Sequence, residues 1–331
     1  MSPCNPGVIL YRYDASPFSV KIDNVLMFKN VPYATVTVAN VLPRPEITES
    51  LGLTYRRIPI LAIGNDIYCD TSLIAAAIER RFPTSQGFGT IFPPKKHGGS
   101  PDTGLLKAFT QHYADTVLFN LGPILLPWNR FPDFFLKDHC AQSQCSSYDK
   151  FPRKGDECIA LVNEQLQDGR EWLFDTELPS LADIGIHFTY NWVCGFPNTR
   201  SLFDEARFPY ALRASWLDRL NKFIKTTRND FPTPQILTGP EAADSIAKSS
   251  YEPYNVIGFD AFEAARLNLV KNQMVNVVPD DTGPQFATFG KLVAFNHEEI
   301  VIETNGTMNA IFRCHFPRIG FTPKGVQNHR L

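Results

Sequence analysis

The sequence lacks an excess of charge of either sign and lacks any long hydrophobic run. Its 331 residues contain 32 lysines and arginines against 34 aspartates and glutamates, so no basic surplus favours nucleic acid or an anionic membrane. No stretch approaches the roughly 18 apolar residues of a membrane span, and residues 1–7 lack the charged start and apolar core of a secretory signal. We therefore expect a cytoplasmic protein that binds a small molecule, with no nucleic acid partner and no membrane partner.

Cysteine is too scattered for a disulfide framework. The seven cysteines form an odd set in a long chain, which predicts reduced thiols. His139, Cys140 and Cys145 lie close together in the sequence, but their spacing fits no zinc template well. We therefore expect no metal and interpret this segment as a loop.

What the sequence does contain is a compact alternation of strand and helix signals over residues 8–82. The apolar residues 8–11 form a run short enough for a buried strand, and apolar residues from Phe18 onward recur at helical spacing. Ser16 stands where this strand gives way to the helix, and Pro17 suits the first helical position. A helix start presents unpaired backbone amides, which can bind an anion.

One more strand signal, a hairpin and a last helix follow in this region. Residues 33–38 form one strand, residues 58–63 and 67–69 form the hairpin around the turn Gly64-Asn65-Asp66, and residues 70–82 form the helix, so the strands number three in all. The Pro-rich residues 40–57 leave room for one more helix. The predicted order is strand, helix, strand, helix, strand, strand, helix.

This unit resembles the thioredoxin-like N-terminal domain of glutathione S-transferases, in register over residues 8–82. Three motifs carry the resemblance: Ser16-Pro17-Phe18 after the first strand, Ile58-Pro59 where the family has a cis-proline, and Asp70-Thr71-x-x-Ile74, which is similar to the family's Glu-Ser-x-x-Ile. Omega-like relatives have Cys-Pro-Phe at the first motif, and zeta-like relatives have a serine there. The motif therefore resembles that of an omega/zeta-like member, and the C-terminal part of the chain is similar to tails of fungal-type transferase-like proteins.

Helical patterns dominate after residues 84–100, a stretch rich in Gly, Pro and Lys that we interpret as a linker. Ser180 and Asp183 form a capping box, similar to the one in the helical C-terminal domain of the family. Helices are expected at residues 105–125, 157–166 and 212–224, and an irregular aromatic loop at residues 128–151. We expect a thioredoxin-like domain over residues 1–83 and an all-helical domain over residues 101–250.

Residues 251–331 depart from the pattern of an ordinary family member. Asp260 and Glu263 predict a capping box and a helix that reaches residue 270. Strand patterns follow at residues 274–278, 292–295, 300–303 and 310–315, with Asn305-Gly306 as a tight turn. The predicted fold class is therefore α/β plus all-α, with a helix and a small β-rich C-terminal appendage, for which a barrel is one arrangement.

The resemblance implies glutathione as co-substrate and Ser16 as the catalytic residue. The glutathione thiol has a pKa near that of free cysteine, about 8.5, and lowering it by about two units needs roughly 2.7 kcal/mol. A hydrogen bond from a hydroxyl to a charged acceptor contributes about 1.5–3 kcal/mol, and a helix N-terminus about 0.3–2 kcal/mol. The Ser16 hydroxyl would donate to the sulfur, with the Phe18 backbone amide nearby.

The rest of glutathione needs other groups. Ile58, before Pro59, would pair its backbone with the cysteinyl part. Asp70 would take the γ-glutamyl ammonium, and the Thr71 hydroxyl and helix start would take the γ-glutamyl carboxylate.

Arginines supply the remaining candidates. Arg57 matches a position that often touches glutathione in the family, whereas Arg44 and Arg56 are candidates for the glycyl carboxylate on charge alone. Interpretations without a bound ligand stay open. Ser16, Asp70 and Thr71 can cap their helices without any ligand, and the arginines can be solvated.

Two classes of function follow. The first is an enzyme that adds the glutathione thiolate to a small hydrophobic electrophile with a conjugated C=C bond, by conjugation or by cis-trans isomerisation, with secondary metabolism as one setting. Phe119 and the aromatic residues of 128–135 could line the second site or simply pack in a core. The hydroxyl of Ser16 disfavours a thiol reductase, because it cannot form mixed disulfides. The second class is a non-catalytic binding or scaffold protein. The resemblance also implies a homodimer.

Overall fold

The computed structural model describes residues 7–126, 128–139, 151–196, 199, 203–212, 215–281, 283, 285–306 and 309–326. The chain forms two compact units. The first, here called the sheet unit, consists of Met1–Ser19, Pro32–Ala77 and Thr233–Leu331, and the second, the helical unit, consists of Val20–Val31 and Ile78–Pro232. The end of the chain thus belongs to the same unit as its beginning.

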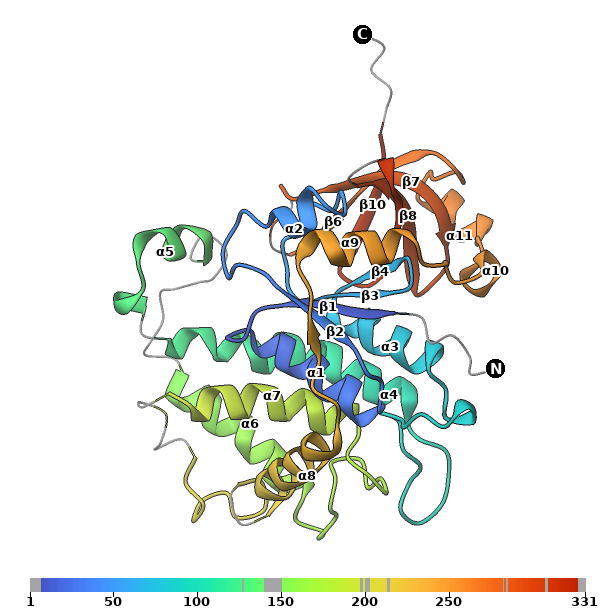
Figure 1. The fold of residues 1–331 in the computed structure, drawn as a ribbon. Coiled ribbons are helices and arrows are strands. Elements are labelled where there is room, and N and C mark those ends of the chain that lie inside the picture. Colours follow the sequence, from blue (N-terminus) through green and yellow to red (C-terminus); the bar gives the residue numbers. More distant parts are fainter. Residues whose placement is uncertain are drawn as a thin grey trace. The chain divides into compact units, whose positions relative to one another are not determined.

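The first seven elements occur in the predicted order (Figure 1). They are β1 (Val8–Arg12), α1 (Pro17–Phe28), β2 (Ala34–Thr37), α2 (Pro45–Thr48), β3 (Ile60–Ile63), β4 (Asp66–Cys69) and α3 (Thr71–Arg81). Strand β1 runs parallel to β2 and antiparallel to β3, and β3 and β4 form the predicted hairpin. The thioredoxin-like fold is therefore confirmed, and α2 is the helix for which the Pro-rich connection left room.

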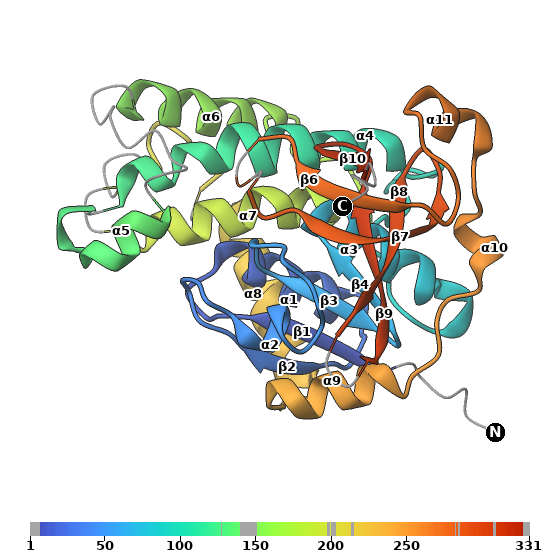
Figure 2. The same cartoon turned by 90° about the horizontal axis from the view of Figure 1, so that it is seen from above.

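The C-terminal strands continue the same sheet. They are β6 (Met274–Pro279), β7 (Thr288–Phe295), β8 (Glu299–Asn305), β9 (Ile311–Pro317) and β10 (Phe321–Gly325). Strand β9 pairs in parallel with β4, and both lie side by side in Figure 2. The ten strands follow the order β10-β6-β7-β8-β9-β4-β3-β1-β2-β5, where β5 is Gln235–Ile236. The β-rich tail is confirmed, but the expectation of a separate barrel is corrected, because β9 takes up the backbone hydrogen-bonding edge of β4.

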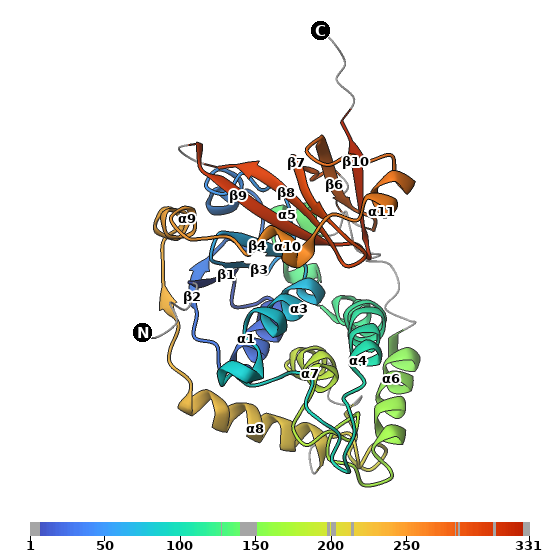
Figure 3. The same ribbon diagram turned by 90° about the vertical axis from the view of Figure 1, so that its right-hand side faces the viewer.

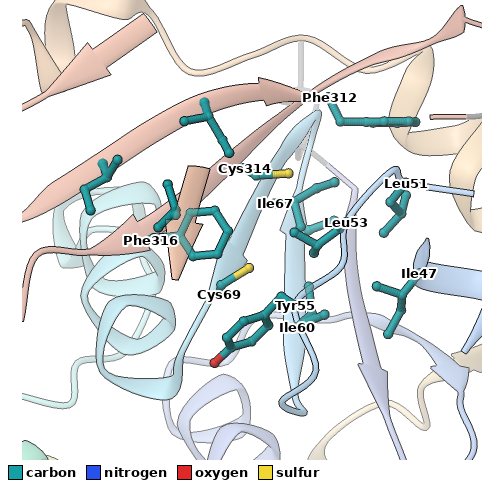
Figure 4. Close-up of a cluster of buried hydrophobic side chains, with 14 of the residues drawn as sticks. Ile47, Leu51, Leu53, Tyr55, Ile60, Ile67, Cys69, Phe312, Cys314 and Phe316 are labelled. Carbon is teal, nitrogen blue, oxygen red and sulfur yellow. The ribbon is translucent and has the colours of Figure 1, made fainter. Parts of the chain in front are cut away.

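One hydrophobic core joins the two halves of this sheet. Figure 4 shows Leu53, Ile60 and Ile67 from the N-terminal part facing Cys314 and Phe316 from β9, and all five are fully or almost fully buried. Burying a large apolar side chain contributes about 1.5–3 kcal/mol. The tail is therefore an integral part of the unit that contains the candidate site.

The connection between α2 and β3 lies directly against the turn between β8 and β9. Gly52 has a φ of +66°, and a Cβ atom at this position would lie 2.0 Å from the carbonyl oxygen of Asn305. The Thr304 hydroxyl donates to the carbonyl of Leu51 at 3.1 Å. Only glycine allows so close an approach in this conformation.

Short helices lie between β5 and β6 in the chain. They are α9 (Gly239–Ala247), α10 (Tyr254–Ile257) and α11 (Ala261–Arg266). The Asp260 side chain accepts from the amides of Phe262 and Glu263, each at 3.0 Å, which confirms the N-cap. The other half of the expected capping box does not form, because the Asp260 amide donates to the carbonyl of Phe295 at 2.7 Å. The helix ends at Arg266, earlier than the predicted residue 270.

The helical unit contains most of the remaining helices. They are α4 (Thr103–Ala108), a π-helix (Phe109–Leu118), α5 (Asp133–His139), α6 (Phe151–Gln165), α7 (Leu181–Cys194) and α8 (Trp216–Asp230). Figure 3 shows α4, α6 and α7 grouped together. The capping box of α7 is confirmed, since Asp183 Oδ2 accepts from the Ser180 amide at 2.9 Å and from its hydroxyl at 2.8 Å. Among the helices of the described residues, none has both the length and the apolar composition needed to cross a membrane.

One segment of the helical unit differs from its prediction. The aromatic residues 128–151 were expected to form a loop, but 128–130 form a 3-10 turn and Asp133–His139 form α5. Asp133, an acidic residue in the first turn, is a favourable helix start. Cys140 and Cys145 lie outside the described residues.

Candidate functional site

Ser16 lies at the first turn of α1. Its backbone amide donates to the carbonyl of Tyr13 at 3.1 Å, and its Oγ accepts from the amide of Ser19 at 3.2 Å. Ser16 is only 3% exposed. The hydroxyl therefore caps α1, as one of the interpretations without a bound ligand expects. However, a hydroxyl that accepts one hydrogen bond still carries a proton to donate, so the cap also orients Ser16 as a donor.

Asp70 and Thr71 form the start of α3 in the same unit. Asp70 Oδ1 accepts from the Ser72 amide at 2.9 Å and from its hydroxyl at 2.6 Å. Asp70 also has a φ of +75°, a conformation that costs a residue with a side chain about 1–2 kcal/mol. Thr71 follows Asp70 directly and is buried.

The peptide bond between Ile58 and Pro59 is cis, as the resemblance implies. Pro59 is buried and leads directly into β3, whereas Ile58 is half-buried against the core of the sheet unit. The structure thus keeps Ile58 and Pro59 in the same unit as Ser16, Asp70 and Thr71.

Arg57 is held by the C-terminal part of the chain. Its Nη2 forms an ion pair with Asp281 Oδ1, and its guanidinium lies 6.0 Å from the ring centre of Phe321. Burial alone would lower the pKa of Arg57, but Tyr55, Asp281 and Asp70 raise it. Arg57 therefore remains a cation that neighbouring carboxylates stabilise. Asp281 was not identified from the sequence, since no motif surrounds it.

Arg44 has a structural role in the connection that leads to Arg57. Its guanidinium is almost fully buried and donates to the carbonyls of Ala39 at 2.7 Å and Asn40 at 3.3 Å, and to the carbonyl of Arg56. These backbone oxygens engage three of the five N–H donors of the guanidinium. Arg44 thus stabilises the connection, and Arg56, half-buried, contributes its carbonyl to that arrangement.

A second polar group, also missed in the sequence, lies where β9 joins β4. His315 is within 3.1 Å of Asp66 Oδ1 and 3.0 Å of Glu299 Oε2, and all three side chains are at most 2% exposed. Burial alone would lower the pKa of His315, but the hydrogen bonds and charges of Asp66 and Glu299 raise it above the usual value. The available signal was weak: His315 lies within an expected strand, whereas Asp66 and Glu299 each directly precede one. In the described part of the chain, no cluster of His, Cys, Asp and Glu suits a metal ion.

The aromatic residues proposed for a second site fall into separate groups of the helical unit. Phe119 stacks on Phe188 and Trp192 with ring centres 5.9 Å and 5.5 Å apart, which is core packing. Trp128, Phe131 and Phe135 form another cluster, and Phe134 is 61% exposed. These five side chains therefore do not form one surface.

Comparison with known proteins identifies the N-terminal region. Residues 10–86 match the family model of the glutathione S-transferase, N-terminal domain. This region of the chain is therefore similar to a glutathione S-transferase N-terminal domain. Residues 153–229 match a domain of unknown function, DUF7962, and no curated protein matches the chain.

Solved structures support the same fold. A GST-like protein from Pseudomonas syringae is 23% identical and has a TM-score of 0.74, and the match covers 97% of this chain and 100% of that chain. A match of this length includes the C-terminal strands. The glutathione transferase URE2P8 from Phanerochaete chrysosporium, whose structure contains oxidized glutathione, is 16% identical with a TM-score of 0.50, covering 70% of this chain and 96% of that chain. At these identities the likeness shows the fold.

Proposed function

We propose that this chain is a glutathione transferase of the fungal-type, omega/zeta-like kind. Its glutathione S-transferase N-terminal domain would bind glutathione through Ser16, Phe18, Arg57, Ile58, Pro59, Asp70 and Thr71. The observation that carries the proposal is the position of the Ser16 hydroxyl. It lies at the start of α1, is fixed by the Ser19 amide at 3.2 Å, and retains a proton for a second acceptor.

The proposed chemistry begins with the thiol. Glutathione loses its thiol proton to the solvent on binding, and the Ser16 hydroxyl and the start of α1 stabilise the sulfur anion. The thiolate sulfur then forms a bond to one carbon of a conjugated C=C bond, and the π electrons move toward the conjugating group. If the adduct is protonated and released, the reaction is conjugation. If the former double bond rotates and the sulfur leaves again, the reaction is cis-trans isomerisation.

Glutathione itself would span the remaining groups. Asp70, already held at the start of α3, would face the γ-glutamyl ammonium, and Thr71 the γ-glutamyl carboxylate. Arg57 is the cation next to the cis-proline, and because Arg44 is engaged with backbone carbonyls, Arg57 is our candidate for the glycyl carboxylate. We further propose a small hydrophobic electrophile as second substrate and a cytoplasmic location. We also propose a homodimer, and analytical ultracentrifugation would test this oligomeric state.

The variant Ser16→Ala tests the role of the hydroxyl. We expect it to raise the pKa of the bound glutathione thiol by roughly one to two units, measured from the ultraviolet absorbance of the thiolate as a function of pH. The matched control is Thr238→Ala, because Thr238 caps α9 with its hydroxyl in the same way. Both variants lose a helix cap, worth about 1 kcal/mol, but only Ser16→Ala should change the thiol. Equal pKa values in Ser16→Ala and the parent would show that Ser16 is not the activator.

A non-catalytic binding or scaffold protein is the second candidate. Two observations are compatible with it: Ser16 is only 3% exposed, and its hydroxyl accepts a hydrogen bond from the Ser19 amide. A serine that only caps a helix would show both features. Retention on glutathione-agarose separates the two. A folded protein that flows through supports the scaffold, whereas retention followed by elution with free glutathione supports the transferase.

A further inference from the structure

The C-terminal strands bring a carboxylate to one of the proposed glutathione residues. Asp281 follows β6 closely in the chain and forms an ion pair with Arg57, 224 residues away in the sequence. The Arg57 side chain is 29% exposed and that of Asp281 is 65% exposed. A ligand in solution can therefore reach both members of the pair.

Several contacts hold residues 54–57 against the C-terminal strands. The Thr54 hydroxyl donates to the carbonyl of Ala287, and the ring of Tyr55 packs against Phe316 and Phe321 with centres 6.0 Å away in each case. Figure 4 shows Tyr55 beside Phe316. Residues 54–57 lead directly to Ile58 and the cis-proline. Their contacts with the C-terminal strands therefore fix the position of Arg57. The ion pair with Asp281 is thus built into one compact unit.

Arg57 already has carboxylate partners. Two carboxylates act on its single positive charge: Asp281 through the ion pair and Asp70 through its electrostatic field. A third carboxylate, brought by a ligand, must displace Asp281 from Arg57 or remain close to an uncompensated negative charge. A ligand group without charge meets neither obstacle. The charge of the ligand group that faces Arg57 therefore affects how tightly the ligand binds.

We propose that Asp281 determines which thiol peptide the site accepts. A γ-glutamyl-cysteinyl thiol whose far end is uncharged, as in an amide or an ester, binds better than one with a free glycyl carboxylate. This inference rests on the proposed function, because it assumes that a thiol peptide occupies the site beside Arg57. It assigns a specificity role to the C-terminal strands.

The test compares two ligands and two variants by calorimetry. The ligands are reduced glutathione and its ethyl ester at the glycyl carboxylate. The variants are Asp281→Asn and the matched control Asp280→Asn. Asp280 is the adjacent carboxylate and accepts from the Thr322 hydroxyl at 2.5 Å, so the control removes the same charge from a residue that is paired elsewhere.

In the parent, the ester should bind more tightly than glutathione. Asp281→Asn should tighten glutathione binding about threefold to fivefold, the upper part of the range for one partly exposed ion pair, and should leave the affinity for the ester within about twofold. Asp280→Asn should match the parent. The inference alone is overturned if glutathione binds the parent and Asp281→Asn equally well, or if Asp280→Asn gives the same gain. If neither ligand binds any of the three proteins, the proposed glutathione site fails as well.

Discussion

His315 Nε2 lies 3.1 Å from Asp66 Oδ1, and this contact links β9 to β4 across 249 residues of sequence. On the other side of the ring, Nδ1 lies 3.0 Å from Glu299 of β8. The ring of Tyr68 covers His315 with centres 4.4 Å apart. An imidazole between two buried carboxylates is therefore one polar connection between the N-terminal and C-terminal parts of the ten-stranded sheet.

Replacing this histidine should strongly destabilise the sheet unit. His315→Leu leaves Asp66 and Glu299 buried without the imidazolium between them, and breaking a buried ion pair in this way costs about 3–5 kcal/mol. We expect this loss in the free energy of unfolding, measured by urea denaturation. His297→Leu, at an exposed position near the start of β8, should change it by no more than about 0.5 kcal/mol. Equal urea midpoints for His315→Leu and the parent would contradict the role of His315.

The same contact predicts a pH dependence. Because the folded protein raises the pKa of His315 above its usual 6.5, protonation stabilises the folded state. This stabilisation is fully present below about pH 6.5 and is lost as the pH rises through the higher folded pKa. The stability difference between the parent and His315→Leu should therefore shrink as the pH is raised above about 6.5. A difference that grows over the same range would mean that His315 is neutral in the fold.

The close approach at Gly52 predicts a site that is intolerant of substitution. Gly52→Ala meets both a φ of +66° and a carbonyl oxygen 2.0 Å from the new Cβ. Gly320 has a similar φ of +83° but open space around it, so Gly320→Ala should cost only the conformational term of about 1–2 kcal/mol. Thermal unfolding should rank Gly52→Ala clearly below Gly320→Ala. The same melting temperature for both would show that the connection between α2 and β3 moves away from the β8–β9 turn at little cost.

The buried cysteines predict a pattern of chemical labelling. Cys69 and Cys314 are fully buried, and burial raises the pKa of the Cys314 thiol to about 12. Cys194, in contrast, is exposed. A thiol reagent should label Cys194 in the native protein, whereas Cys69 and Cys314 should react only in denaturant, because the thiolate is the reactive form. Peptide mapping by mass spectrometry measures each site. Native labelling of Cys314 would mean that β9 separates readily from β4.

Local features of the sequence predicted much of the fold. Ser180 and Asp183 define a helix start through their own side chains, and Gly64 and Asn65 define a hairpin, so neighbouring residues suffice for both. The pairing of β9 with β4 could not be predicted in this way, since no residue near His315 specifies which strand it will join. Lys29 illustrates the same limit. It directly follows α1 and is fully buried, and only the fold reveals Glu79 at 3.0 Å as its ion-pair partner.

The residues of the candidate site also differ in whether local sequence determines their positions. The positions of Ser16, Asp70 and Pro59 follow from helix starts and a proline, which act locally. The pairing of Arg57 with Asp281 connects two distant segments, and only the packing of the C-terminal strands brings them together. Arg44 was proposed on charge alone, and its engagement with three backbone carbonyls depends on the path of the whole connection.

The most direct test of the proposed function is the number of protons released when reduced glutathione binds, measured by calorimetry in buffers with different ionisation enthalpies. At about pH 7 the free thiol, with a pKa of about 8.5, is almost fully protonated, so a site that ionises it must release most of one proton. We predict this release for the parent, a smaller one for Ser16→Ala, and none for S-methylglutathione, which has no thiol proton. Absence of binding, or a release no larger than that with S-methylglutathione, would contradict the account.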